Sequence, residues 1–320
     1  METQNRDSLI TLDENILDPK LDPIFKALFT SETYESKEAL KDFLSAFTDQ
    51  KVIEATLLPN EPSITQREEK QIRFDFSCKF NSGERATVEM ALKHRPDELT
   101  RSEYYVSKLF ISQESKGEDD YDKLMSAYQI TLLAEGKFFD DNKTVHNFEY
   151  YDKENNISLD GKTRIITFEM SKLDKKTIPD NQKDNWGAFL KWANDKTKLE
   201  DINKIIESEG GIAMAAEALR GISLNEIMQI RAIEAEKKVK DYQSDMARSK
   251  REGIQIGEAR GEARGRQEGR QEGRQEGEAN KAIEMAIKSL EEGLEPSLIS
   301  RLTNLSIDQI NALKSQNNVE

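Results

Sequence analysis

The chain has 320 residues, and its 61 acidic and 47 basic side chains give a formal net charge of −14. No apolar run approaches the roughly 20 residues of a membrane-spanning helix, and one cysteine with two histidines excludes a disulfide framework and a zinc site built from several cysteines. The N-terminus has neither the basic nor the apolar region of a secretory signal, so we expect a soluble, cytoplasmic protein that uses carboxylates for any metal chemistry.

Composition divides the chain into five parts. We predict a loose N-terminus over 1–17, an α/β domain over 18–173, a helical region over 174–247, a glycine-periodic helix or linker over 248–278, and a small C-terminal helical module over 279–320. The second part alternates between strand-like and helix-like patterns and holds most of the aromatic residues, so it is the candidate for the folded core.

Two short helices open the α/β part. Residues 22–29 have an Asp cap, a proline at the first helical position and apolar residues three or four apart, which is typical of a helix. Apolar residues along 36–47 share one side of a second predicted helix. The other predicted elements are a strand over 51–58, a helix over 101–112, and strands over 127–133 and 164–170.

A β-hairpin is the clearest local prediction. Residues 71–80 and 84–93 alternate between an apolar and a mostly polar face, with Ala91 on the polar one, and they flank the short loop Asn81-Ser82-Gly83. Alternation with a period of two on both sides of a turn that ends in glycine is typical of a hairpin. Counting outward from this loop places Asp75 opposite Glu89 on the polar face, with their Cβ atoms roughly 4.5–5.5 Å apart.

Two like charges that face each other weaken a sheet unless something neutralises them. One interpretation is that Asp75 and Glu89 splay into water or pair with Arg73, Lys79 or Lys93. The other is that they hold a divalent cation, because Mg²⁺ is bound by one or two carboxylates together with water and phosphate oxygens. Such an ion lowers the pKa of a bound water and offsets charge on a phosphodiester under attack.

Four motifs occur in a fixed order around this hairpin. They are DPIFKALF at 22–29 with the pattern D-x-x-F-K-x-x-F, IRFD at 72–75, VEM at 88–90, and RSEYYVSKL at 101–109 followed by Gln113, Gly117 and Tyr121. Together they resemble the PD-(D/E)xK nucleases, and more narrowly the Rpn-like recombination-promoting nucleases, which are also described as transposases of that nuclease family. The resemblance runs from about residue 18 to 173 and recurs in the glycine-periodic tail.

The resemblance implies an α/β fold with a PD-(D/E)xK restriction-endonuclease-like core, in which helices flank a mixed central sheet, followed by an all-helical C-terminal region. It also implies a DNA endonuclease that hydrolyses phosphodiester bonds with Mg²⁺ or Mn²⁺ held by Asp75 and Glu89, with a role in promoting recombination. Lys26 would lie near this site on the first helix, where it contacts phosphate or simply snorkels. Arg101 and Gln113, twelve residues apart on one predicted helix face, would line the DNA groove.

One position departs from the family pattern. The second acidic motif usually reads Glu-x-Gln or Glu-x-Lys, and here Ala91 stands at its third position. A methyl group cannot steady a nucleophile or stabilise a charged transition state. Lys93 points from the same strand face two residues later, either toward the metal or outward as a surface lysine. The chain is therefore either a weakly active endonuclease or a catalytically impaired protein that acts through DNA binding or self-assembly, and the sequence does not show whether Ala91 is natural or engineered.

The tail contains glycines at a strict spacing of four, from Gly253 to Gly277, with the repeat Arg-Gln-Glu-Gly over 266–277. Each glycine costs a helix about 1 kcal/mol relative to alanine, so a flexible linker is one interpretation. The other is a helix whose small residues let a second chain approach closely, which predicts a homodimer or larger assembly held partly by 248–278. Beyond it, Ser306 and Gln309 have capping-box spacing, which fits a helix-turn-helix or a plain helical end-cap.

Overall fold

The computed structural model describes residues 11–13, 15–59, 75–113, 121–174 and 178–316. It divides into two compact units, residues 1–239 and 240–320. None of the described helices is long and apolar enough to cross a membrane.

The first unit is built on a mixed six-stranded sheet, with strands in the order β1-β2-β3-β4-β8-β5. Strands β1 to β3 are antiparallel to one another, β3, β4 and β8 are parallel, and β5 closes the far edge antiparallel to β8. A separate small sheet is formed by β6 and β7. The strands are β1 (Ala55–Leu58), β2 (Phe76–Phe80), β3 (Arg85–Lys93), β4 (Ala127–Glu135), β5 (Val145–Phe148), β6 (Tyr151–Asp152), β7 (Ile157–Ser158) and β8 (Thr163–Glu169).

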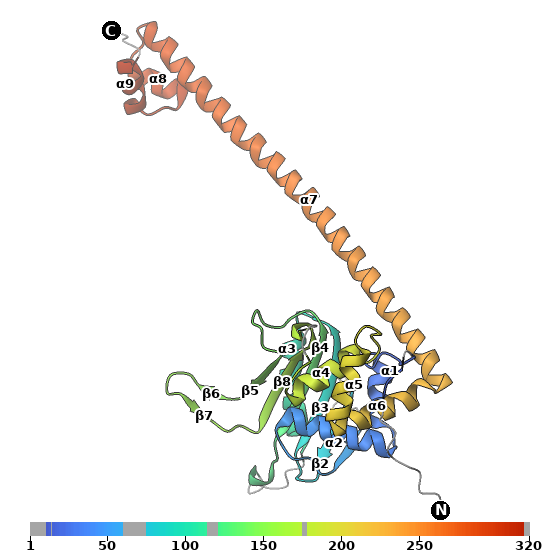
Figure 1. Ribbon diagram of the computed structural model, residues 1–320. Coiled ribbons are helices and arrows are strands. Elements are labelled where there is room, and N and C mark those ends of the chain that lie inside the picture. Colours follow the sequence, from blue (N-terminus) through green and yellow to red (C-terminus); the bar gives the residue numbers. More distant parts are fainter. Residues whose placement is uncertain (1–10, 14, 60–74, 114–120, 175–177, 317–320) are drawn as a thin grey trace, which may run out of the picture. The chain divides into compact units, whose positions relative to one another are not determined.

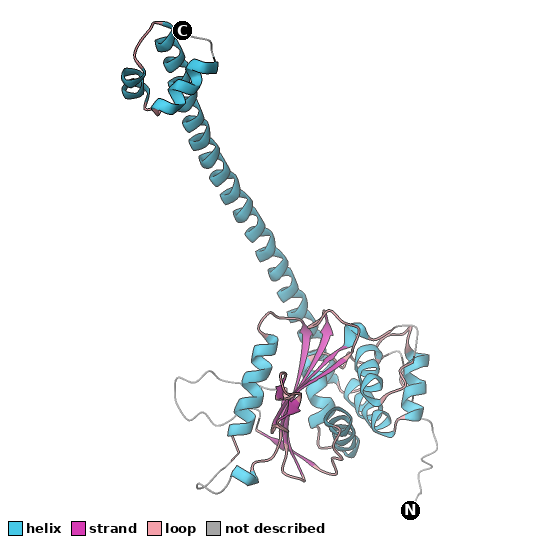
Figure 2. Ribbon diagram, turned by 90° about the vertical axis from the view of Figure 1, so that its left-hand side faces the viewer, coloured by secondary structure: helices cyan, strands magenta, loops and turns pink. Residues whose placement is uncertain are grey.

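Helices cover both faces of the large sheet (Figures 1 and 2). Helix α3 packs on one face against β3, β4 and β8, and the other face is covered by α1 and α2, with α4 to α6 packed behind them. The helices of this unit are α1 (Asp22–Thr30), α2 (Tyr34–Thr48), α3 (Glu98–Ile111), α4 (Gln182–Trp192), α5 (Leu199–Ser208) and α6 (Gly210–Ser223), with 3-10 turns at Tyr121–Lys123 and Met170–Lys172. The predicted sheet flanked by helices is therefore confirmed.

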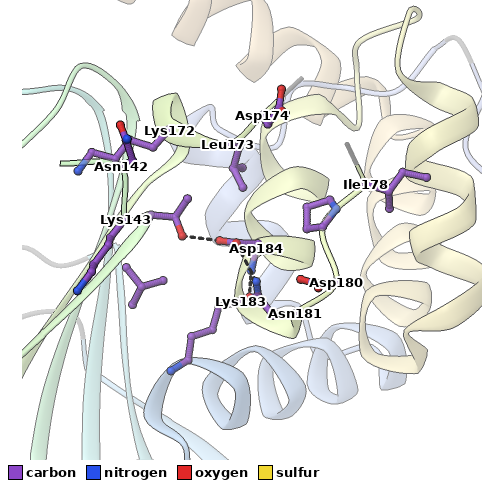
Figure 3. Close-up of a pocket in the computed structure, with 13 residues that line it drawn as sticks. Asn142, Lys143, Lys172, Leu173, Asp174, Ile178, Asp180, Asn181, Lys183 and Asp184 are labelled. Atoms are coloured by element: carbon purple, nitrogen blue, oxygen red, sulfur yellow. Dashed lines mark hydrogen bonds between the residues drawn. The ribbon is translucent and has the colours of Figure 1, made fainter. Parts of the chain in front are cut away.

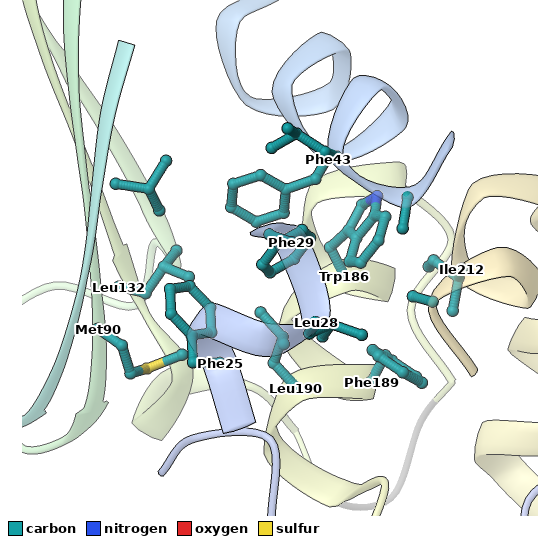
Figure 4. Packing of buried hydrophobic residues seen from close by; sticks show 14 of the residues in the cluster. Phe25, Leu28, Phe29, Phe43, Met90, Leu132, Trp186, Phe189, Leu190 and Ile212 are labelled. Carbon is teal, nitrogen blue, oxygen red and sulfur yellow. The ribbon is translucent and has the colours of Figure 1, made fainter. Parts of the chain in front are cut away.

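The core lies between the sheet and helices α1, α2 and α4 (Figure 4). Phe25 and Phe29 of α1 are fully buried, and both rings contact Phe76 of β2, with centroids 5.7 and 5.4 Å apart. On the opposite side, Phe29 and Phe43 pack against Trp186 of α4. Because the apolar side of α1 is anchored in this way, the position of its polar side chains relative to β2 is fixed.

Several predicted element boundaries need correction. Strand β1 begins at Ala55, four residues later than predicted, and α3 ends at Ile111, so Gln113 lies beyond the helix on which its groove position depended. Strands β5, β6 and β7 were not predicted at all. The predicted strand residues 71–74, with Arg73 among them, lie outside the described residues.

The second unit consists of helical segments. Helix α7 (Glu226–Glu291) continues from the first unit through the whole glycine-periodic segment, so of the two interpretations of that segment the helix is the one observed. Its end packs with α8 (Pro296–Thr303) and α9 (Ile307–Gln316) around a small apolar cluster of Ala286, Leu290, Ile299 and Ile310. Ser306 and Gln309 exchange side-chain to backbone hydrogen bonds, which confirms the capping box at the start of α9.

Candidate metal-binding carboxylate site

The predicted hairpin brings the two candidate carboxylates to the same end of β2 and β3. Phe80 and Glu84 close the loop through a backbone hydrogen bond of 2.8 Å, and Ser77 pairs with Thr87, which confirms the predicted register. Asp75 directly precedes β2, and its Oδ2 accepts a 2.7 Å hydrogen bond from the backbone N–H of Met90. The Asp75 carboxylate is thereby fixed beside the strand segment that carries Glu89.

The Asp75 carboxylate is held in a shielded position between the sheet and α1. Its side chain is 14% exposed, and the Lys26 ammonium lies 3.5 Å from Asp75 Oδ1 and 2.6 Å from Asp22 Oδ1. Burial raises the pKa of Asp75 to about 7, because loss of water disfavours the charged form. The negative charge of Asp22 adds to this rise, whereas the Met90 N–H and the Lys26 ammonium oppose it.

Glu89 is held by a residue of a different helix, α3. Its side chain is 15% exposed, and Arg101 Nη2 donates a 3.0 Å hydrogen bond to Glu89 Oε1. Burial and the nearby negative charge of Glu98 raise the pKa of Glu89, and the Arg101 guanidinium counteracts them. Arg101 also lies 3.8 Å from the buried Glu98 carboxylate and 5.2 Å above the centre of the Tyr105 ring, so its guanidinium is oriented by several contacts.

The sequence model of the PD-(D/E)XK nuclease family transposases matches residues 19–250, which is well over half of the chain. The chain belongs to this family. Membership indicates a nuclease or transposase-like function, and nucleases of this kind typically use divalent metals and act on DNA. The mixed sheet flanked by helices is consistent with a PD-(D/E)XK-like α/β fold. No curated protein and no solved structure matches the chain.

A hard divalent cation fits the donor set of this candidate site. Asp75 and Glu89 offer carboxylate oxygens, the donors that Mg²⁺ and Mn²⁺ favour, and both charges are poorly solvated. Within the described parts of the chain, no group of three or more His, Cys, Asp or Glu side chains has the geometry to hold a metal ion. Asp75 and Glu89 would hold the ion together with water and phosphate oxygens, as is common for Mg²⁺.

The remaining predicted site residues lie in different surroundings. Ala91 pairs with Leu133 of β4, and its methyl group adds no polar atom to the site. Lys93 does not reach toward the carboxylates, since its ammonium lies 3.5 Å from Glu135 Oε2 on the neighbouring strand. The side-chain amide of Gln113 exchanges two hydrogen bonds, of 2.7 and 2.9 Å, with the backbone of Met125. Both polar atoms of the Gln113 amide are thus engaged with the Met125 backbone, and its place in the DNA groove stays a prediction.

Sequence reasoning missed two acidic neighbours of the site. Asp22 lies one helical turn before Lys26 and shares its ammonium with Asp75. Glu98, at the start of α3, is 2% exposed and affects both Arg101 and Glu89. The spacings Asp22–Lys26 and Glu98–Arg101 are typical of helical ion pairs and were the available signal. The spacings did not reveal that the basic residue of each pair also contacts a second carboxylate, which lies on the hairpin.

Part of the polar face of the hairpin does not face water. Helix α3 packs against β3 and β4 there, and Thr87, Gln129 and Thr131 are completely buried. Ser102 of α3 hydrogen-bonds Thr131 at 3.0 Å, and the Gln129 amide donates to the same hydroxyl. These bonds fix α3 on the sheet, and with it the direction of Arg101. The interpretation in which the carboxylates splay into bulk water is therefore wrong.

A cavity of about 710 Å³ lies elsewhere, beside the start of α4 (Figure 3). Thr144 and Asp184 both line it, and the Thr144 hydroxyl donates a hydrogen bond to Asp184. Two lysines of its lining are already neutralised, because Lys172 pairs with Glu169 and Asp141, and Lys183 pairs with an aspartate of the α2 C-cap. Since neither Asp75 nor Glu89 lines this cavity, we assign it no part in the metal site.

Proposed function

We propose that this chain is a metal-dependent DNA endonuclease that hydrolyses phosphodiester bonds, with Mg²⁺ or Mn²⁺ held by Asp75 and Glu89. The observation that supports this most strongly is the pair of shielded carboxylates at one end of the hairpin, each with a raised pKa. Burying a carboxylate is unfavourable unless a cation compensates its charge. Family membership supplies the substrate class, which is DNA.

The bound cation would lower the pKa of a water molecule and offset charge on the phosphodiester. The chain's own residues prepare the site for it. The Met90 N–H fixes the orientation of Asp75, and Arg101 fixes that of Glu89. Lys26 and Arg101 are also the cations nearest to the carboxylates, so we assign them the contacts with DNA phosphates, which basic side chains commonly provide.

Ala91 supports a second candidate, in which the protein keeps the fold and the metal site but turns over slowly or not at all. The position that usually carries an amide or an ammonium carries a methyl group, and Lys93 pairs with Glu135 rather than replacing it. Removing one transition-state donor typically costs a factor of about 10²–10³ in rate. Such a protein would act through DNA binding or self-assembly.

Plasmid nicking with titrated Mn²⁺ and Mg²⁺ tests both candidates. We expect metal-dependent nicking that Asp75→Ala abolishes and that Ala91→Lys or Ala91→Gln increases, while Lys93→Ala leaves it unchanged. Calorimetry should detect uptake of one cation by the wild-type chain and none by Asp75→Ala. Absence of cation uptake by the folded wild-type protein would refute the proposed metal site, whereas uptake without nicking would favour the impaired protein.

We also propose that the protein forms a homodimer or larger assembly through 248–278. The segment is a continuous helix, exposed from 248 to 276, despite its seven glycines, and a helix of that composition needs stabilisation from outside itself. Multi-angle light scattering at micromolar concentration tests this, and a monomeric mass would refute it. Recombination remains the proposed setting for the nuclease, supported by the transposase family.

A further inference from the structure

Arg101 and Glu98 lie close together beside the proposed metal site without completing a hydrogen bond. Arg101 Nη2 holds Glu89 through its 3.0 Å hydrogen bond, whereas its Nε–H is buried and has no hydrogen-bond partner among the described residues. Glu98 Oε1 lies 3.8 Å from this Nε, just beyond hydrogen-bonding distance. A buried donor without an acceptor is unfavourable, so its position beside a carboxylate calls for a reason.

Glu98 has the complementary deficit. Its side chain is 2% exposed, and burial raises its pKa although the Arg101 and Arg95 guanidinium groups oppose the rise. Arg95 pairs with Asp97 instead, at 3.6 Å. Among the described residues, Glu98 has no ion pair other than the long one with Arg101. The donor and the acceptor of the missing hydrogen bond are thus both present and both buried.

We infer that Glu98 is a positioning residue that receives the Arg101 guanidinium when Glu89 turns to a cation. This inference rests on the proposed metal site and specifies how that site opens. Arg101 turns from Glu89 to Glu98, completes the hydrogen bond from its Nε–H and leaves the Glu89 oxygens free. Hydrogen bonds of this kind are about 2.9 Å long, so a shift of roughly 1 Å is enough.

The surroundings permit this movement in the Arg101 side chain alone. Helix α3 is fixed on the sheet by the hydrogen bond between Ser102 and Thr131, so its backbone stays in place. The guanidinium lies 5.2 Å above the centre of the Tyr105 ring, and an aromatic face attracts a planar cation throughout a short displacement. Arg101 therefore remains in the site after the shift, where we propose that it contacts DNA phosphate.

Lys26 shows the same arrangement at the other carboxylate, but with the exchange already made. Its ammonium lies 2.6 Å from Asp22, the acid of its own helix, and 3.5 Å from Asp75. For Arg101 the order is reversed, with 3.0 Å to the hairpin carboxylate and 3.8 Å to the acid of its own helix. Arg101 is thus the basic side chain that still has to leave its hairpin carboxylate.

Calorimetric titration of the full chain with Mn²⁺ tests the inference through a double-mutant cycle. We expect Arg101→Met to bind Mn²⁺ about tenfold more tightly than the wild type, because no guanidinium has to be displaced. Glu98→Gln keeps the shape of the side chain and removes its charge, so it should bind Mn²⁺ more weakly. Glu103→Gln, at an exposed position of α3, is the matched control and should leave the affinity unchanged.

The comparison between two backgrounds decides the role of Glu98. Loss of a negative charge, or of a further metal ligand, would weaken binding equally in the wild type and in Arg101→Met. A residue that acts by receiving Arg101 has this part of its effect only when the arginine is present. We therefore expect Glu98→Gln to cost about tenfold more affinity in the wild type than in Arg101→Met, which is the worth of one hydrogen bond to a charged group.

A second cycle leaves the buried residues untouched. The Asp22 side chain is 63% exposed, so Asp22→Asn is expected to fold normally. Because Asp22 holds the Lys26 ammonium away from Asp75, its replacement should weaken Mn²⁺ binding more in the wild type than in Lys26→Met. Arginine Nε–H NMR gives a direct view of the exchange. The Arg101 proton, assigned with Arg101→Lys, should move downfield on saturation with Mg²⁺ as it gains an acceptor.

The outcomes separate this inference from the proposed function. Equal losses for Glu98→Gln in both backgrounds, or an Arg101 Nε–H signal that stays in place in the Mg²⁺-saturated chain, would overturn the exchange and leave the metal site standing. A folded wild-type chain that takes up no Mn²⁺ would refute the metal site itself. Plasmid nicking is a separate measurement, and neither conclusion depends on it.

Discussion

Asp75 is expected to lower the stability of the metal-free protein, and replacing it by asparagine should therefore stabilise the fold while removing the metal site. Asparagine has nearly the same shape, and its side-chain oxygen can still accept the hydrogen bond from the Met90 N–H. Its amide can donate to Asp22, which a carboxylate can do only when protonated. Asp75→Asn loses the attraction to the Lys26 ammonium. That ammonium keeps its ion pair with Asp22, at 2.6 Å.

The size of the effect follows from the pKa of Asp75. Its ordinary value of 3.8 rises to about 7 in the folded protein, which corresponds to at most about 4 kcal/mol. Because the pKa is raised on folding, the stabilising contribution of the protonated form is complete below pH 3.8. It is lost as the pH rises through 7. After subtraction of the lost attraction to Lys26, we expect Asp75→Asn to gain about 1–3 kcal/mol at pH 8 and far less at pH 4.

Urea unfolding in the presence of EDTA measures this gain. Both tryptophans of the chain, Trp186 and Trp192, are buried in the first unit, so their fluorescence reports on the unit that contains the site. Glu103→Gln is the control, because it removes a carboxylate from an exposed position of α3. The reasoning is refuted if Asp75→Asn destabilises the metal-free protein at pH 8 or if its gain is the same at pH 4. Saturating Mn²⁺ should reverse the order of the two proteins.

Three further predictions concern other parts of the structure. Arg101→Met leaves the shielded Glu89 carboxylate without its partner. We therefore expect the free energy of unfolding, measured with urea in the presence of EDTA, to fall by about 1–3 kcal/mol. Recovery of this stability on adding Mn²⁺ would show that the ion replaces the arginine. Gly187→Ala drives a Cβ atom into the buried Phe168 ring and should destabilise by about 1–3 kcal/mol, whereas Gly221→Ala meets open space on α6 and should stabilise by up to about 1 kcal/mol. Ser306→Ala removes the capping box of α9 and should cost that helix about 1 kcal/mol, which hydrogen exchange of its first amides would detect.

The hairpin and its register could be predicted from the sequence because they depend on local rules. The alternation of side chains fixes which residues share a face, and the loop length fixes which residues are opposite. Gly83 adopts a φ of +100°, a conformation that glycine alone reaches easily, and it closes the loop where the sequence placed it. From these facts the placement of Asp75 and Glu89 at the same end of the hairpin follows by counting.

The surroundings of the carboxylates could not be predicted in the same way, because they depend on contacts between distant segments. Lys26 lies 49 positions before Asp75 and reaches it only because α1 is anchored in the aromatic core. Likewise, Arg101 meets Glu89 because α3 covers a sheet face whose alternating pattern alone suggested a solvated surface. The short strands β5 to β7 were missed for a related reason, since segments of two to four residues carry too little pattern to recognise.

The energetics of Asp75 and Glu89 also bear on whether these carboxylates have a structural or a functional role. A structural ion pair is expected to stabilise its carboxylate and lower its pKa, but the pKa of both Asp75 and Glu89 is raised despite Lys26 and Arg101. The fold would thus be served better by amides at both positions, which could keep the hydrogen bonds without the buried charge. Carboxylates that cost stability in this way need another reason to be present, and binding of a divalent cation provides one that the proposed measurements test directly.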